Sequence, residues 1–236
     1  MPLSTEGPTR TFRQNVTVAV LLAAVAGEVN AVGFVLLGRH TSHMTGQVAA
    51  AGEALAHGDT TVALQALKLV SAFVLGAATA AALLDLTRAR RSRYTAVLAL
   101  EALVLAASSV CAIRSETQLV ALPLALCFAM GLQNAIVTRI SGAVVRTTHL
   151  TGVLTDFGME CVRVIRWFFG ARGERVGHAR LAQLERASLH VALVVSFLGG
   201  ATVGPVLLHY VGGLALGAPV LLLLALVIVD WRASHA

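Results

Sequence analysis

The chain has 236 residues, of which 57% are hydrophobic and only 13% are charged, and its formal net charge is +6. Because soluble domains carry about 25% charged residues, this composition excludes an ordinary soluble protein. The positive charge comes from arginines that lie between apolar segments, with no Gly-aromatic or zinc-binding pattern beside them, so it does not indicate binding to nucleic acid.

The apolar residues fall into six segments whose length, about twenty residues, matches the hydrocarbon thickness of a bilayer crossed by an α-helix. These segments are residues 16–38, 62–84, 95–113, 119–137, 189–208 and 212–229. The first segment is too long for the apolar part of a signal peptide, so we expect it to remain as a membrane helix. The sequence therefore predicts an all-α integral membrane protein with six transmembrane helices.

The arginines predict the orientation of these segments. If the N-terminus is cytoplasmic, fifteen of the seventeen arginines lie in cytoplasmic segments, and only Arg39 and Arg114 lie outside. Arginine and lysine in short loops favour the cytoplasmic side. We therefore expect a cytoplasmic N-terminal segment, residues 1–15, and a cytoplasmic C-terminus.

Two short polar sequence motifs each occur twice, in the same order along the chain. Residues 27–31 (GEVNA) in the first segment are followed by residues 42–47 (SHMTGQ). Residues 131–135 (GLQNA) in the fourth segment are followed by residues 148–153 (THLTGV). A doubled pattern of this kind indicates an internal repeat.

The repeat predicts the architecture, because each half contains three spans. An odd number of spans places the second half upside down relative to the first, as in inverted-repeat transporters. We therefore expect two inverted three-helix repeats, residues 16–113 and residues 114–236. Each repeat would have a short helix after its Thr-Gly pair, near residues 46–57 in the first and residues 151–169 in the second.

The second short helix is predicted to be amphipathic. Its apolar residues recur at intervals of three and four: Leu154, Phe157, Cys161, Val164 and Phe168. The charged residues on its other side are Asp156, Glu160, Arg163 and Arg166. We expect this helix at the inner membrane interface, with Thr151 as its N-cap, and a solvated loop over residues 170–186.

Polar side chains inside the spans are the first candidates for a site, because they are costly in a membrane unless they are paired or hydrated. Glu28, near the middle of the first span, is either a proton or solute site or a structural acid bonded to another helix. Asn30, Gln133 and Asn134 either orient a solute or form hydrogen bonds between helices.

The residues around the two Thr-Gly pairs are the second candidates. His43 and His149 are either pH-responsive groups or interfacial residues that cap neighbouring carbonyls. The Thr-Gly pairs begin helices, whose free N–H groups suit an anion or carboxylate. The candidate solute-binding residues are therefore Glu28, Asn30, His43, Thr45, Gly46, Gln133, Asn134, His149, Thr151 and Gly152.

The sequence gives no sign of catalysis or of a cofactor. It contains no GxSxG, HExxH or glycine-rich phosphate loop, and its three cysteines are widely spaced without a CxxC pair. We expect no enzyme activity, no metal and no cofactor. Gly200 with Gly204, and Gly213 with Gly217, are spaced for close helix packing, either within the chain or in a homodimer.

Together with residues 72–76 (AFVLG) and 146–152 (RTTHLTG), the two doubled motifs resemble the YoaK family of bacterial multi-span membrane proteins. The resemblance covers nearly the whole chain from the first span onward. It implies a six-span protein of the bacterial inner membrane, and it supplies no activity.

Two functions fit these observations. The first is a small secondary transporter or permease for an unknown solute, with its site between spans one and four. The alternative is a scaffold or sensor that does not transport and that binds a partner or anionic lipid through its inner basic loop. In both cases the lipid bilayer is the immediate partner.

Overall fold

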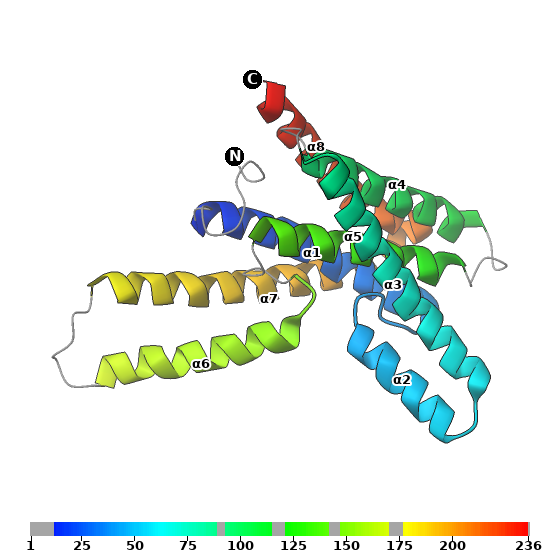
Figure 1. Cartoon of the computed structure of the whole chain (residues 1–236), viewed down its shortest axis with the longest axis horizontal. Helices are drawn as coiled ribbons and strands as arrows, with labels where there is room; N and C mark the ends of the chain where they lie inside the picture. The colour runs from blue at the N-terminus through cyan, green and yellow to red at the C-terminus, as the bar shows by residue number, and fades with distance from the viewer. Residues whose placement is uncertain (1–11, 89–92, 115–120, 142–146, 170–176, 236) are drawn as a thin grey trace.

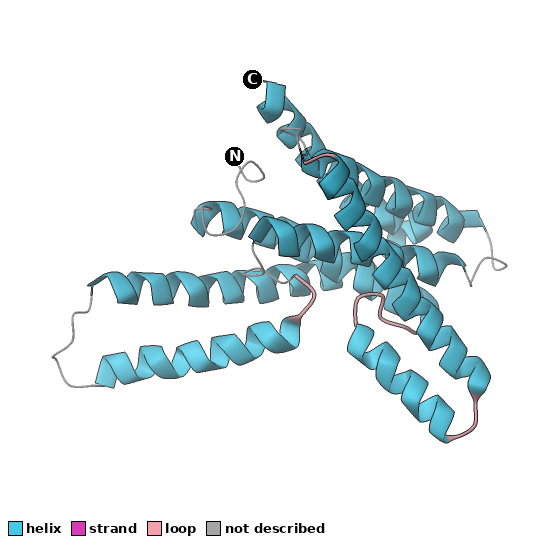
Figure 2. Cartoon of the chain, in the orientation of Figure 1, coloured by secondary structure: helices cyan, strands magenta, loops and turns pink. Residues whose placement is uncertain are grey.

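The computed structural model describes residues 12–88, 93–114, 121–141, 147–169 and 177–235 (Figure 1). All regular elements within these residues are helices, as predicted (Figure 2). They are α1 (Phe12–Leu37), α2 (Met44–Ala56), α3 (Thr60–Leu86), α4 (Arg93–Arg114), α5 (Ala121–Ser141), α6 (Leu150–Phe169), α7 (Gly177–Val211), the 3-10 helix η3 (Gly212–Leu216) and α8 (Gly217–His235).

Five stretches of the described chain are long and apolar enough to cross a membrane. They are Val16–Leu37, Thr60–Leu86, Tyr94–Ile113, Ala121–Ile140 and Gln183–Arg232. The first four lie in α1, α3, α4 and α5. The fifth has 50 residues and contains most of α7, all of η3 and most of α8.

Two predicted boundaries are wrong. The loop predicted over residues 170–186 is helical from Gly177 onward, and residues 170–176 lie outside the described residues. Good helix formers such as Ala, Leu, Gln, Glu and Arg continue the helix past the membrane-length segment, so charge alone did not indicate a loop. The sixth span was predicted from residue 212, but residues 212–216 form η3 and α8 begins only at Gly217.

Turns between the helices are made where a residue allows positive φ or supplies a cap. Gly38, Gly58 and Gly212 have φ values of +65°, +74° and +59° at the ends of α1, α2 and α7. Glycine adopts this conformation without the clash that a Cβ would cause. Asp59 then caps α3, because its side chain accepts a hydrogen bond of 2.9 Å from the N–H of Val62.

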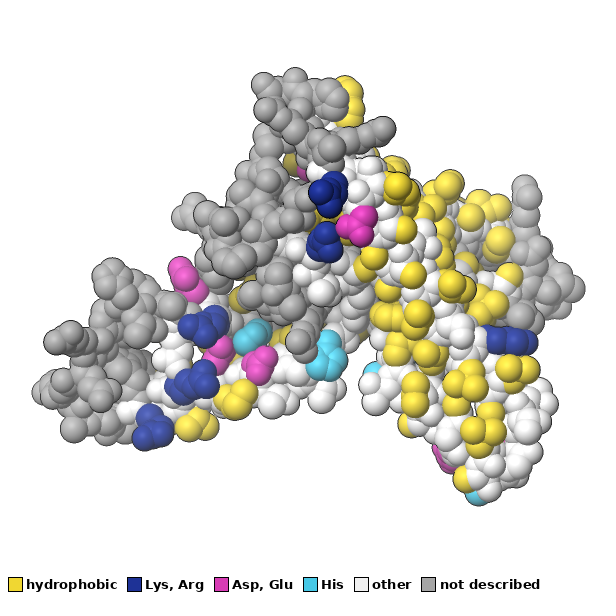
Figure 3. Space-filling model, in the orientation of Figure 1, with side chains coloured by type: hydrophobic (Ala, Val, Ile, Leu, Met, Phe, Trp, Pro, Cys, Tyr) yellow, Lys and Arg dark blue, Asp and Glu magenta, His cyan; other side chains and the backbone are white. Residues whose placement is uncertain are grey.

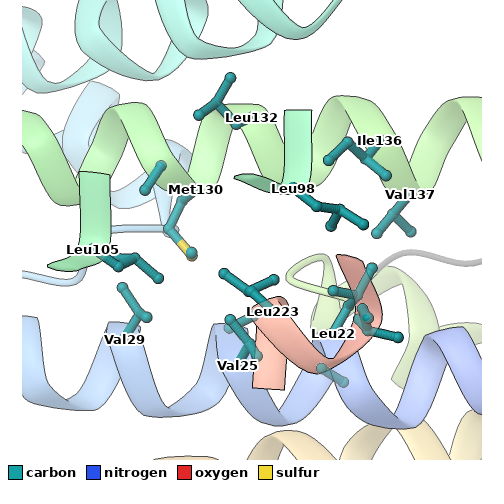
Figure 4. Packing of buried hydrophobic residues seen from close by; sticks show 14 of the residues in the cluster. Leu22, Val25, Val29, Leu98, Leu105, Met130, Leu132, Ile136, Val137 and Leu223 are labelled. Carbon is teal, nitrogen blue, oxygen red and sulfur yellow. The ribbon is translucent and has the colours of Figure 1, made fainter. Parts of the chain in front are cut away.

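The core lies between α1, α4, α5 and α8. Its buried side chains interdigitate between these helices (Figure 4). Among them are Leu22, Val25, Val29, Leu98, Leu105, Met130, Leu132, Ile136, Val137 and Leu223. Hydrophobic side chains also cover the visible surface of α3, as expected for a face in contact with lipid (Figure 3).

The crossing of α1 and α7 depends on glycine. A Cβ added to Gly27 would fall on the carbonyl oxygen of Phe197, and one added to Gly200 would fall on the carbonyl oxygen of Ala24. The two backbones therefore touch, as small residues allow in membrane proteins. Gly204 also packs against α1, so this predicted small-residue pair is used within the chain.

The crossing of α3 and α5 has the same construction. A Cβ added to Gly131 would fall on the carbonyl oxygen of Phe73, and one added to Gly76 would fall on the carbonyl oxygen of Phe128. Gly213 in η3 likewise lies against the backbone of α4, whereas a Cβ on Gly217 would meet nothing within 4 Å.

Two hairpins extend from this bundle in different directions (Figure 1). In the first, α2 packs back against α3, and in the second, α6 packs back against α7. A helix was predicted over residues 151–169, and α6 confirms it, starting one residue earlier.

Candidate functional site

Glu28 lies in the interior, at the crossing of α1 and α7. Its side chain belongs to a residue that is only 3% exposed, and its Oε1 atom has no hydrogen-bond partner among the described residues. Gly204 leaves room for it, because a Cβ there would lie 3.0 Å from Glu28 Cγ. One oxygen of this carboxyl group thus lies buried between two helices without the hydrogen bond that such an atom normally needs.

Asn30, two residues further along α1, holds the connection that leads into α2. Its Oδ1 atom accepts hydrogen bonds from the N–H and Oγ of Ser42, at 3.2 and 3.0 Å. Its Nδ2 lies 3.0 Å from His40 Nδ1. The Nε2 of Gln47 donates to the carbonyl oxygen of His40 over 3.1 Å. One amide on α1 therefore fixes both the connection and the first turn of α2.

His40 is the titratable member of this cluster. Burial lowers its pKa below 6.5, and the charge of His43 lowers it further. Since an amide Nδ2 only donates, His40 Nδ1 accepts, and the ring is neutral with its proton on Nε2. The ring also stacks on Phe34, with centroids 4.5 Å apart. His40 was not among the predicted site residues, although it stands two positions before residues 42–47 (SHMTGQ).

Asn134 has the corresponding role in front of α6. Its Oδ1 accepts from the hydroxyl of Thr148 over 2.6 Å, and its Nδ2 donates to the carbonyl oxygen of Met130 over 2.7 Å. The hydrogen bonds of Asn30 and Asn134 thus go to nearby connections and to their own helix, and not to another spanning helix.

Gln133, in contrast, joins two spanning helices. It is completely buried, and its Nε2 donates to the carbonyl oxygen of Leu22 in α1. Its Oε1 has no partner among the described residues. Figure 4 shows Met130 near the Val29 end of α1 and Val137 near the Leu22 end, so α1 and α5 run in opposite directions. Asn30 and Asn134 therefore serve connections toward opposite ends of this helix pair.

The two predicted histidines lie over the first turns of the short helices. His43 is the N-terminal flanking residue of α2, and its Nδ1 is 2.7 Å from the position that a Cβ of Gly46 would occupy. His149 lies over Gly152 in the same way, at 2.5 Å. Glycine at these two positions therefore lets each imidazole fold onto its helix.

Thr45 and Thr151 are exposed in the first turns of these helices. The prediction that Thr151 caps α6 is wrong, because the helix already begins at Leu150. The side chain of His43 makes no capping hydrogen bond in α2.

The two sides of α6 also differ from the prediction. Glu160, assigned to the charged side, is 4% exposed and faces α7, where its Oε2 lies 3.0 Å from Nδ1 of His190. Leu154, assigned to the apolar side, is exposed, which is compatible with a side that faces lipid. A helix at a membrane can present apolar side chains both to protein and to lipid. The periodicity of its apolar residues therefore did not show which side of α6 packs against α7. The side chains of Trp167 and Phe168 lie outside the described part.

Glu101 on α4 is a second buried acid, and it was not among the predicted site residues. It is fully buried, and neither carboxyl oxygen has a partner among the described residues. Within the described part of the chain, no group of three His, Cys, Asp or Glu side chains is placed to hold a metal ion.

The chain is similar to a protein family and to a named transmembrane protein. A family described as "Protein of unknown function (DUF1275)" matches residues 18–229. The UPF0700 transmembrane protein RA0705 of Rhizobium meliloti (strain 1021) is 32% identical over 219 residues, which cover 91% of this chain and 86% of the relative. No solved structure matches the chain significantly.

Proposed function

The chain belongs to the family described as proteins of unknown function (DUF1275), and a relative is named a transmembrane protein. From the polar residues buried in its interior, we propose that this protein is a small secondary transporter or permease. The observation that carries the proposal is the Glu28 carboxyl, buried near the middle of a spanning helix with an unpartnered oxygen. Ionisable groups at such positions are costly and mark solute or proton pathways. The solute is of unknown identity.

Six crossings with both termini in the cytoplasm of a bacterial cell are part of this proposal. A stretch of 50 residues is long enough for two crossings of about twenty residues each. Gly212 and η3 interrupt it between α7 and α8, which supports a turn at this point. The excess of arginine in the connections supports the orientation. The doubled motifs that resemble the YoaK family fall within the matched residues.

The inverted repeat is supported by pairs of contacts. The same number of positions separates Gly27 from Gly131 and Asn30 from Asn134. Each glycine meets the carbonyl oxygen of a phenylalanine, Phe197 for Gly27 and Phe73 for Gly131. In consequence α1 packs on α7, and its counterpart α5 packs on α3. This exchange of partners is what a two-fold axis between the halves produces.

In the proposed transporter, each half of the repeat supplies one gate, that is, one short helix that opens or closes the interior from its own end. Asn30 and Asn134 tie the connections before α2 and α6 to the helices that hold Glu28 and Gln133. A movement of either short helix would therefore reach the interior from one end of the bundle. Glu28 contacts the solute or carries its coupling proton, and no covalent step is required.

The test is uptake into liposomes by wild type, Glu28→Gln and the control Glu53→Gln. Glu53 lies exposed on α2, so its substitution tests loss of a carboxyl elsewhere. With a broad solute panel and a proton gradient, we expect uptake by wild type and control, and a loss of at least about tenfold in Glu28→Gln, equivalent to about 1.4 kcal/mol. No uptake of any solute, with Glu28→Gln also harmless in cells, would refute the proposal.

A scaffold or sensor is the second candidate, favoured by the surface of α6. This helix exposes Leu154, Val162 and Ile165 beside Arg163 and Arg166, a combination that suits an anionic membrane surface. Arginine side chains gather on the visible side of the α6–α7 hairpin (Figure 3).

Water access to position 28 separates the two functions. In a cysteine-free background, a transporter predicts that Glu28→Cys reacts with a membrane-impermeant maleimide, whereas a scaffold with a solid interior predicts no reaction. Leu75→Cys, at a lipid-facing position that is 61% exposed, is the unreactive control in both cases.

A further inference from the structure

Glu101 occupies the most enclosed position of any described carboxylate. It lies on one face of α4 with Leu98, Leu105 and Ser108, at helical intervals of three and four residues. These four residues are 0 to 2% exposed. In Figure 4, Leu98 and Leu105 point into the space between α5 and α1. Glu101, between them on the same face, therefore points into the centre of the bundle.

Within the described residues, no charged group is paired with this carboxyl. The elements packed against α4 are α3, α5, η3 and α8. Among their described residues, Lys68 and Arg232 are exposed, Asp85 and Arg139 form an exposed pair at 3.2 Å, and Asp230 accepts a hydrogen bond from Thr95 near the start of α4. None of these groups is bonded to Glu101, whose two oxygens have no partner among the described residues.

A structural acid would be expected to show a hydrogen bond from at least one oxygen, because buried polar groups in proteins are nearly always bonded. A metal ion would require several oxygen ligands around one point. The oxygens of Ser108 and Gln133 that lack partners among the described residues are also buried, but no hydrogen bond joins them to Glu101. A proton, however, requires only the one carboxyl, and the neutral acid fits apolar surroundings.

We propose that Glu101 is a proton-binding site separate from Glu28, and that it exchanges its proton with water when α4 moves relative to α5 and α8. This inference rests on the proposed transport function and names its coupling ion. The reaction is the release and uptake of one proton by the carboxyl group. Release leaves a charge in the core, so it must accompany entry of water or of a solute, and this requirement couples the proton to transport.

Infrared spectroscopy of the protein in lipid nanodiscs tests this without a known solute. We expect wild type to show the C=O band of a protonated carboxyl that Glu101→Gln loses and that Glu28→Gln and Glu53→Gln retain. On transfer to D2O the band should shift to lower frequency as the proton exchanges. A band unaffected by Glu101→Gln would overturn the proposal, and so would a band that does not shift in D2O, because a sealed structural acid behaves in that way.

If Glu101→Gln does not fold, Glu101→Asp provides the measurement. It keeps a carboxyl but changes its position, so the band should persist at a shifted frequency, and an unchanged spectrum would overturn the assignment. Transport is measured separately by the uptake assay. An exchanging Glu101 band without uptake supports the proton site and refutes the transporter, whereas uptake with no Glu101 band refutes the proton site alone.

Discussion

The two hairpins occupy corresponding places in the molecule but are packed by different chemistry. In the first, α2 buries Ala51 and Ala54, and the neighbouring part of α3 buries Ala63 and Ala66. In the second, Glu160 of α6 pairs with His190 of α7. The two pairs of contacts occupy equivalent positions of the repeat. Glu160 and Ala54 lie equally far after the Thr-Gly pairs of their halves. His190 and Ala66 lie equally far before the crossing glycines Gly200 and Gly76.

This difference shows that one architecture tolerates two kinds of contact. Small side chains bring α2 and α3 together through van der Waals contact, which does not depend on charge. The α6–α7 contact instead depends on two ionisable groups with exposed fractions of 5% and 12% for their side chains. The first hairpin is therefore held by small apolar side chains, whereas the second places a hydrogen-bonded polar pair in the corresponding contact.

The largest loss of stability is expected at the glycine crossings of α1 with α7 and of α3 with α5, which are built alike in the two halves. Gly76→Ala and Gly200→Ala each place a methyl group on a backbone carbonyl, and each should destabilise the protein by about 3 kcal/mol or more. Gly52→Ala in α2 and Gly158→Ala in α6 are matched controls, because a Cβ there meets nothing within 4 Å. The controls should be neutral or gain up to about 1 kcal/mol. Thermal melting in detergent measures all four, and equal melting temperatures would contradict the crossing.

The next effect separates the hairpins. Glu160→Ala or His190→Ala alone leaves the other polar group buried without its hydrogen-bond partner, so each should cost about 1–3 kcal/mol. The double variant copies the alanine packing of the first hairpin and should cost clearly less than the sum. Asp156→Asn, on the exposed side of α6, is the control and should change little. Additive losses in a double-mutant cycle of melting temperatures would show that the pair does not hold α6.

The smallest effect is a pH dependence at the connection that leads into the first hairpin. The lowered pKa of His40 means that the unfolded chain binds a proton more readily than the folded one. Stability is therefore complete above pH 6.5, the ordinary value, and falls as the pH decreases through it toward the lowered pKa. Asn134 is held by the hydroxyl of Thr148, which does not titrate in this range.

Melting of wild type and His40→Asn from about pH 7.5 to about pH 5.5 checks this prediction. Both proteins carry the other titratable groups, so only the difference between them reports on His40. We expect wild type to lose more of its melting temperature than the variant. Parallel curves would mean that the contact between His40 and Asn30 does not control stability.

Most of the fold followed from patterns that are local in the sequence. Runs of apolar residues located α1, α3, α4 and α5, and three- and four-residue spacing located α6. The candidate site was predicted less completely. Asn30 and Asn134 were predicted, but their partners His40 and Thr148 lie across turns. Glu101 lies in a predicted span but outside the doubled motifs, so the repeat did not point to it.

The sequence alone determined that this protein is helical and membrane-like, because hydropathy and helical period are properties of neighbouring residues. Only the tertiary structure decided which face of α6 meets α7, and that Gln133 reaches α1 while the asparagines hold the connections. Only the tertiary structure decided, too, that Glu101 lies in the centre with no hydrogen-bond partner among the described residues. The physical reason is that burial and hydrogen bonding depend on helices far apart in the chain, and both protein and lipid present apolar surroundings to the same side chains.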